Sequence, residues 1–257
     1  MPREAPCARV MLQGQLLRTM LPMAPFACTG CGDCCRGFAR ETPEWAPERG
    51  PVLRLSDEPG LPLLSWEWQR LREQAAIKGI EFPTQAFDGV LDTANKRVVV
   101  MSYRLGGLEC VFFESRADLA AGARSEQWGY GRGGVCSIYP HRPLACRAYP
   151  LVPMRKGIAL SLYCPELVDA DVADEAALRA AYGDSAWDAA AFRTSPGLAV
   201  ELLHDLEDRG AVRVAAEARD HAVEARAGWP RVDLCDLAAE HGLGAWQELE
   251  RRSRLRP

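Results

Sequence analysis

The stretch Cys28-Thr29-Gly30-Cys31-Gly32-Asp33-Cys34-Cys35 constrains the chain more than any other, because it places four thiols within eight residues. Thiols at this density would collide or oxidise unless a bound group held them apart, and a thiophilic metal centre does so. Glycines at positions 30, 32 and 37 let the backbone adopt positive φ angles and bring amide N–H groups close to sulfur. The stretch therefore predicts a metal site.

The size of the chain makes a disulfide framework an unattractive explanation for these thiols. With 257 residues, 48% of them hydrophobic, the chain can bury an ordinary core without cross-links. Clustered cysteines in a chain of this length more often bind metal or do redox work, which predicts a reducing, cytoplasmic location. The apolar residues between positions 10 and 23 are interrupted by Gln13, Gln15 and Arg18, so we expect neither a signal peptide nor a membrane span.

Charge and motif content narrow the classes of partner and of reaction. The net charge is −4, and proteins whose main partner is nucleic acid usually carry a basic excess, so we expect no nucleic-acid partner. The chain contains no Gly-x-Ser-x-Gly, His-Glu-x2-His or P-loop signature, so we assign no catalytic residue. Any enzyme activity would have to work through the metal centre, and a protein partner or protein substrate stays open.

Hydrophobic patterning predicts an α+β fold with a small antiparallel sheet. The expected strands are an edge strand at 52–55 and a hairpin formed by 87–91 and 96–105, and together they deliver Cys110 at a strand end. We expect an N-terminal extension over residues 1–25, a cysteine-cluster domain over 26–166 whose sheet and loops surround the metal centre, and a helical layer over 167–257.

Helix signals complete this expectation. Ser65 is expected to cap a helix over 66–78 that ends at Gly79. After residue 166 the strand signal almost disappears, and Ser195, Pro196 and Gly210 have the N-cap, first-turn and C-terminal positions of a helix over 196–209. Further helices are expected at about 172–182, 211–226, 233–241 and 244–254. Cys235 occupies an apolar helical position and is expected to be a buried structural thiol.

A second dense stretch extends the predicted metal site. Cys136 and Cys146 flank Tyr139, Arg142 and Pro143, and Cys164-Pro165 follows. The candidate ligands are eight cysteines, enough for two four-thiolate sites or one site with spare thiols: Cys28, Cys31, Cys34, Cys35, Cys110, Cys136, Cys146 and Cys164. Three arginines beside them, Arg36, Arg142 and Arg147, are expected to offset thiolate charge at the cofactor.

The spacing also bears on which metal is bound. Cys28-x2-Cys31-x2-Cys34 matches the first three ligands of a ferredoxin-type loop, and Cys164-Pro165 is similar to its remote Cys-Pro. Zinc more often takes two separated Cys-x2-Cys pairs. We therefore favour a [4Fe–4S] cluster and keep zinc as the alternative.

Together the two motifs resemble the YkgJ-like or CxxCxxCC cysteine-cluster family, whose members are described as zinc- or iron-chelating or as Fe–S cluster-containing proteins. The resemblance is carried by Cys28-x2-Cys31-x2-Cys34-Cys35 and by Cys136-x-Ile138-Tyr139-x2-Arg142-Pro143-x2-Cys146-Arg147-x-Tyr149-Pro150, and covers about residues 26–166. It implies metal or Fe–S binding. Three functions remain open: a redox or electron-transfer protein, a zinc-stabilised interaction module, or a protein-modifying enzyme resembling the flagellin lysine N-methylases.

Overall fold

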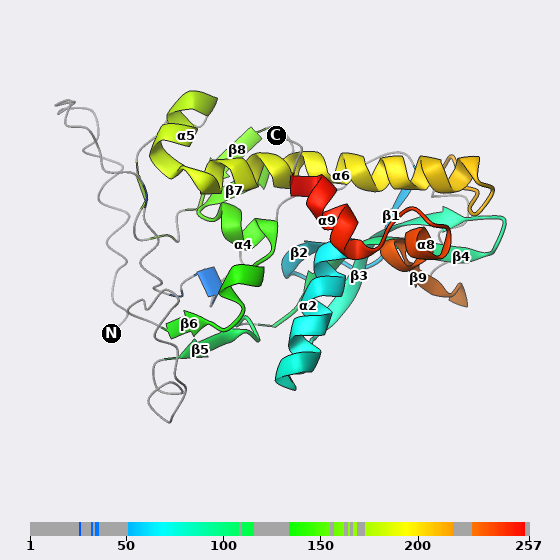
Figure 1. Cartoon of the computed structure of the whole chain (residues 1–257), viewed down its shortest axis with the longest axis horizontal. Helices are drawn as coiled ribbons and strands as arrows, with labels where there is room; N and C mark the ends of the chain where they lie inside the picture. Colours follow the sequence, from blue (N-terminus) through cyan, green and yellow to red (C-terminus); the bar gives the residue numbers. More distant parts are fainter. Residues whose placement is uncertain are drawn as a thin grey trace.

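A computed structural model describes residues 26, 32, 34–35, 51–107, 109–115, 134–154, 157–161, 164, 167–168, 173–217 and 228–254. Within them the fold is α+β, as expected, and Figure 1 shows a long helix, α6, running past a twisted sheet and a group of smaller elements. Those residues form the following elements: β1 (Val52–Arg54), β2 (Leu61–Leu64), α2 (Ser65–Lys78), β3 (Thr84–Asp92), β4 (Arg97–Leu105), β5 (Phe113–Ser115), β6 (Gly134–Cys136), η3 (Tyr139–His141), α4 (Leu144–Ala148), β7 (Leu151–Met154), β8 (Gly157–Leu160), α5 (Glu175–Tyr182), α6 (Asp184–Asp208), β9 (Arg231–Asp233), α8 (Leu234–Glu240) and α9 (Trp246–Arg254).

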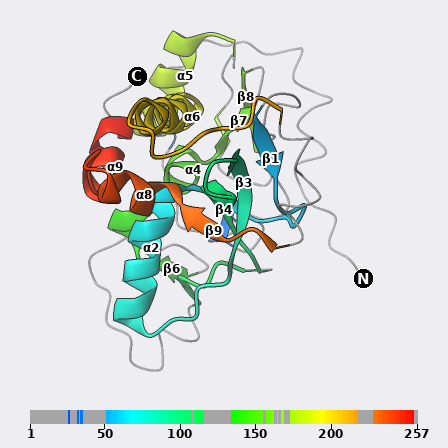
Figure 2. The same ribbon diagram turned by 90° about the vertical axis from the view of Figure 1, so that its right-hand side faces the viewer.

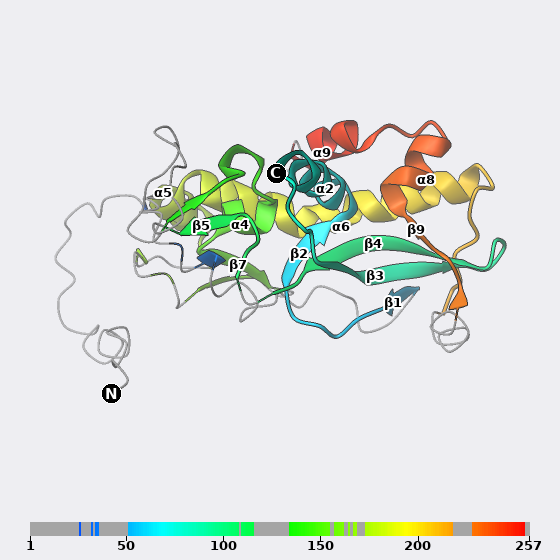
Figure 3. The same cartoon turned by 90° about the horizontal axis from the view of Figure 1, so that it is seen from below.

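The main sheet is built on the long hairpin of β3 and β4, which the sequence predicted. Strands β1, β3, β4 and β2 are hydrogen-bonded in that order and antiparallel, so β1 is the expected edge strand. Strand β9 adds parallel to β4, opposite Val98–Val100. The largely helical part of the chain after residue 166 thus adds one short strand, which the sequence did not predict, to the sheet. Figure 3 shows β9 beside β4 from below.

Helices cover one side of this sheet. Figure 2 looks along α6 and shows α2, α8 and α9 grouped on one side of β3 and β4. The largest apolar cluster joins α6 to the sheet and to α8 and α9, and includes the fully buried Phe192, Leu198, Leu202 and Leu206. A second cluster lies under α2 and contains Phe112 and Ile138, with several cysteines packed against it.

Helix α6 begins earlier than the sequence predicted. It starts at Asp184 and continues through Pro196, so Ser195 is inside the helix and does not cap it. Pro196 has no N–H to donate, so the helix lacks one backbone hydrogen bond at this point. The hydroxyl of Ser195 donates to the carbonyl of Ala191 at 2.6 Å. The helix continues because Phe192 before Pro196 and Leu198 after it are both buried in the cluster that joins α6 to the sheet.

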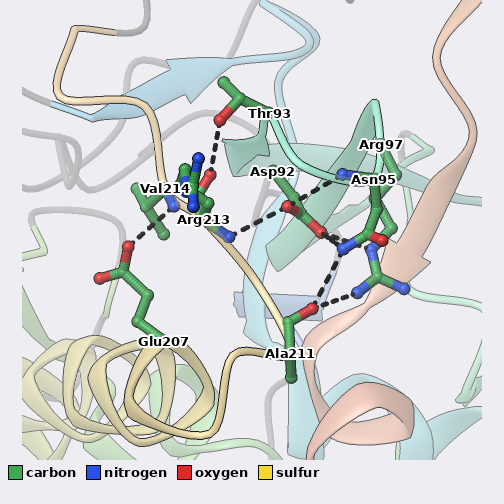
Figure 4. Close-up of polar contacts among 8 residues, drawn as sticks. All are labelled: Asp92, Thr93, Asn95, Arg97, Glu207, Ala211, Arg213 and Val214. Atoms are coloured by element: carbon green, nitrogen blue, oxygen red, sulfur yellow. Dashed lines mark hydrogen bonds and ion pairs between the residues drawn. The ribbon is translucent and has the colours of Figure 1, made fainter.

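The segment after α6 is also different from the prediction. Residues 211–217 form no helix, whereas a helix over 211–226 was expected. They cross the tip of the β3–β4 hairpin, where the buried carboxylate of Asp92 accepts hydrogen bonds from Asn95 Nδ2 at 2.7 Å and from the backbone N–H of Arg213 at 3.0 Å (Figure 4). The guanidinium of Arg97 pairs with the same carboxylate at 2.8 Å. A buried acceptor on the hairpin thus fixes this segment in an extended form.

Helix α2 has its expected C-terminal end, because Gly79 adopts a left-handed conformation with φ of 65°. Its start is shifted by one residue. The N-cap is Leu64, and Ser65 is the first helical residue; its hydroxyl donates to both oxygens of Asp233, at 2.9 and 2.8 Å. In the part of the chain that is described, no helix combines the length and the apolar character that crossing a bilayer requires.

Candidate metal centre

The turn that carries Cys34 and Cys35 is docked on the segment before β5. The backbone N–H of Cys35 donates to the carbonyl of Gly32 at 2.9 Å, and the N–H of Cys110 donates to the carbonyl of Cys35 at 2.8 Å. Gly32 has φ of +81°, and a Cβ atom added there would lie 2.5 Å from the ring of Phe113. Only glycine allows this turn to approach the ring so closely. The contact brings Cys34 and Cys35 beside Cys110, although about 75 residues separate them.

Cys110 and Cys136 are held by two similar backbone turns. Cys136 ends β6 and lies opposite Phe113 in the β5–β6 ladder, so the two cysteine turns are adjacent. In each turn the N–H two residues further along, that of Phe112 or Ile138, donates to the cysteine sulfur and lowers the pKa of the thiol, against burial, which raises it. Such N–H···S bonds stabilise a thiolate and orient a metal ligand.

Cys146 reaches the same place from α4. This short helix begins at Leu144 after the N-cap Pro143, and the N–H of Cys146 donates to the carbonyl of Pro143 at 3.0 Å. Figure 1 shows α4 at the same end of the molecule as β5 and β6. The sulfurs of Cys34 and Cys35 are 4.0 Å apart.

The electrostatics show that five sulfurs share one environment. Burial, together with the charges of Cys136 and Cys34, raises the pKa of Cys110 to about 12. Burial is also the largest cause that raises the pKa of Cys146, followed by the charges of Cys110, Cys34 and Cys136. The pKa of Cys35 is raised first by its hydrogen bond to Cys34 and then by burial. Without a cation, these thiols are held in the neutral form.

Two of the three predicted cofactor arginines lie in the described part of the chain. The charge of Arg142 lowers the pKa of Cys136 and of Cys146, although burial prevails for both thiols. Its guanidinium lies 3.7 Å from the ring centroid of Tyr139. Arg147 forms a two-point ion pair with Asp188 of α6, at 2.7 and 3.1 Å. Arg142 is thus placed to offset thiolate charge, and Arg147 ties α4 to α6.

Cys164 lies after the β7–β8 hairpin. It is buried, and its N–H donates to the carbonyl of Ser161 at 3.2 Å. Ser161 also donates its hydroxyl to Tyr149 at 2.9 Å, which connects this hairpin to the end of the second cysteine motif. The assignment of Cys164 as a ligand stays a prediction.

Three predicted residues, Cys28, Cys31 and Arg36, lie outside the described residues. Among the residues that are described, no three or more His, Cys, Asp or Glu side chains already have the arrangement of a metal site. Cys35, Cys110, Cys136, Cys146 and Cys235 are free thiols. Cys235 is 2% exposed in the main core, which confirms the expected buried structural thiol.

The comparison with protein families agrees with the position of these cysteines. The sequence profile of the domain described as zinc- or iron-chelating and named CxxCxxCC matches residues 27–165, more than half of the chain. The chain belongs to the CxxCxxCC family. No curated protein and no solved structure matches the chain significantly. The family description supports a bound metal, zinc or iron.

The donor set of this CxxCxxCC protein fits such a metal. Five partly buried sulfurs converge from three separate parts of the sequence. Those of Cys110 and Cys136 accept backbone N–H groups, and Arg142 adds positive charge beside Cys136 and Cys146. Mutual repulsion would oppose ionisation of these thiols, and a metal cation removes that repulsion by binding the thiolates.

The residues that hold the second cysteine motif in place could not be predicted from the sequence. Four charged residues contact or support residues 142–147 of this motif: Glu67 and Arg70 of α2, Asp188 of α6 and Glu250 of α9. Glu67 carried one local signal, because a glutamate at the third helical position often bonds the N-cap N–H. Its other partner is 77 residues away and has no signature in the sequence.

Proposed function

We propose that this CxxCxxCC protein binds an iron–sulfur cluster of the [4Fe–4S] type and serves a redox or electron-transfer role. The observation that carries the proposal is the convergence of Cys34, Cys35, Cys110, Cys136 and Cys146, which three chain segments bring together. The ferredoxin-like spacing of Cys28, Cys31 and Cys34 adds to it.

All eight candidate cysteines remain proposed ligands. A cluster takes four thiolates, so eight are enough for two clusters or for one cluster with spare thiols. When bound, a [4Fe–4S] cluster accepts and donates single electrons. The chain's own residues would then set the conditions for that exchange. The N–H groups of Phe112 and Ile138 donate to sulfur, and Arg142 places positive charge beside Cys136 and Cys146. Both features favour the more negative, reduced state and are expected to raise the reduction potential.

A closed zinc site is the second candidate, and one distance favours it. Two thiolates on a tetrahedral zinc with Zn–S bonds of about 2.3 Å lie about 3.8 Å apart. The sulfurs of Cys34 and Cys35 are separated by 4.0 Å, close to this value. In this case the protein would be an interaction module whose cysteine domain is stabilised by zinc.

Anaerobic purification followed by metal and acid-labile sulfide analysis tests the proposal. About four irons and four sulfides per cluster, with a brown colour that bleaches on reduction by dithionite, are expected for the iron–sulfur protein. Stoichiometric zinc without sulfide would replace the redox function with the zinc module. A purified chain that holds neither metal, and takes up neither on reconstitution, would contradict both.

A further inference from the structure

One buried carboxylate connects the N-termini of two helices. Glu67 lies in the first turn of α2 and is 1% exposed. One of its oxygens accepts the backbone N–H of Leu64 at 3.2 Å, and the other accepts the N–H of Leu144 at 2.6 Å. Leu144 is the first residue of α4, two positions before Cys146. The carboxylate therefore holds the start of the helix that carries a candidate ligand.

Arg70, one turn further along α2, holds the other side of Pro143. Its guanidinium donates to the carbonyl of Arg142 at 3.3 Å and pairs with the carboxylate of Glu250 on α9. Arg70 is 4% exposed and Glu250 is 9% exposed, so both charges lie in the interior. Removal of either partner would leave a buried charge without compensation.

Residues 142–144 and the short helix α4 that follows them need outside contacts to keep their orientation. Helix α4 has five residues, too few for a helix that is stable alone, and its first N–H groups have no partner within the helix. The direction of the Cys146 side chain is fixed by that helix. Arg142, whose carbonyl Arg70 binds, also directs its charge at Cys136 and Cys146.

We propose that Glu67 and Arg70 are positioning residues for the metal centre, because they anchor residues 142–144 so that the Cys146 sulfur joins those of Cys34, Cys110 and Cys136. This inference rests on the proposed metal-binding function and assigns α2 a part in it. A purely structural alternative would have the same contacts stabilise the fold and leave metal binding unaffected.

The variant Glu67→Gln distinguishes the positioning role from the purely structural one. Glutamine keeps the shape of the side chain but offers one carbonyl oxygen for two N–H donors, and its NH2 group faces the second donor. We expect the metal-loaded full chain to lose its metal to excess EDTA about 10 times faster than the wild type, at the lower end of the effects seen when supporting residues of metal sites are changed. Loss is followed by the cluster absorption, or by zinc release to a coloured chelator. The second variant is Arg70→Lys. Lysine keeps the positive charge but cannot bind the Arg142 carbonyl and the Glu250 carboxylate at the same time as the guanidinium does.

Asp233→Asn is the matched control, since Asp233 is another buried carboxylate that binds α2, through Ser65 and Gln69. In the described part of the chain, its hydrogen-bond partners do not include the candidate ligand cysteines or residues 142–144. It is expected to lower the melting temperature and leave the rate of metal release unchanged. The inference is overturned if folded Glu67→Gln or Arg70→Lys releases metal at the wild-type rate, or no faster than the control at equal stability. A wild type without metal would overturn the proposed function and this inference together, whereas a metal-loaded wild type with unaltered variants would overturn the inference alone.

Discussion

Replacing Asp233 by alanine should destabilise the fold far more than the same replacement at another helix N-cap. Asp233 caps α8 by accepting the N–H of Cys235 at 2.9 Å. Its carboxylate also accepts the hydroxyl of Tyr103 at 2.8 Å, the hydroxyl of Ser65, and the side-chain amide of Gln69 at 3.0 Å. Asp233 is 7% exposed, so water cannot replace these bonds. The matched control is Asp174, which caps α5 in an exposed position and, among the described residues, accepts the N–H groups of Ala176 and Ala177 alone.

The magnitude follows from the donors left without an acceptor. Loss of an exposed N-cap aspartate costs about 1 kcal/mol. At Asp233 the same loss is joined by three buried side-chain donors, each worth about 1–3 kcal/mol when it is left unpaired. Because Ser65 and Tyr103 hydroxyls can rotate towards other acceptors, we expect about 3–5 kcal/mol in total, a large part of the roughly 5–15 kcal/mol that stabilises a typical domain.

Urea-induced unfolding of the two variants, followed by far-UV circular dichroism, measures this difference. Thermal unfolding provides a second reading, in which Asp174→Ala should lower the melting temperature by about 2–4 °C and Asp233→Ala by roughly 10 °C. Equal losses of stability in the two variants would refute the reasoning, because the burial of the Asp233 donors would then have no energetic effect.

Three further predictions concern the hairpin tip and the metal centre. Burial alone would raise the pKa of Asp92, but hydrogen bonds from Asn95, the Arg213 N–H and Arg97 lower it below its usual 3.8, so Asp92 stabilises the fold above that pH and the contribution is lost as the pH falls through the lowered pKa. The urea midpoint of unfolding should therefore fall more between pH 7 and pH 3 in the wild type than in Asp92→Asn. An equal fall in both proteins would contradict this role of Asp92. Cys146→Ser should lower metal content and melting temperature together, whereas Cys235→Ser should leave the metal content, measured by atomic emission, unchanged; equal metal contents in both would argue against a cysteine centre at this place. Gly32→Ala should weaken metal retention in EDTA, since its Cβ would enter the space of the Phe113 ring, and wild-type retention would show that this approach is not required.

Local patterns were sufficient where the structure depends on neighbours in the sequence. The hairpin of β3 and β4 was predicted because Val98, Val99 and Val100 favour a strand and a polar turn precedes them. The end of α2 followed from Gly79, which adopts the left-handed conformation that terminates a helix at little cost. The edge position of β1 was also correct.

Errors occurred where burial overrides a local signal. Ser195 and Pro196 have the residue types of a helix start, yet α6 passes through them, because the apolar residues before and after Pro196 pack on one surface of the sheet. Residues 211–217 were expected to be helical, but Asp92 of the hairpin binds the N–H of Arg213 and holds the segment extended.

At the candidate metal centre, too, the sequence predicted some features and only the tertiary structure decided the others. Thiol spacing along the chain, which reflects the chemistry of soft metal ions, was enough to predict that a metal is bound and to name its candidate ligands. Packing alone determines that Cys34 and Cys35 meet Cys110, Cys136 and Cys146, and that Glu67 and Arg70 hold the helix of Cys146. The reason is physical: a coordination motif is local and repeats a known spacing, whereas a buried carboxylate finds its N–H partner only after strands and helices from distant parts of the chain have packed together.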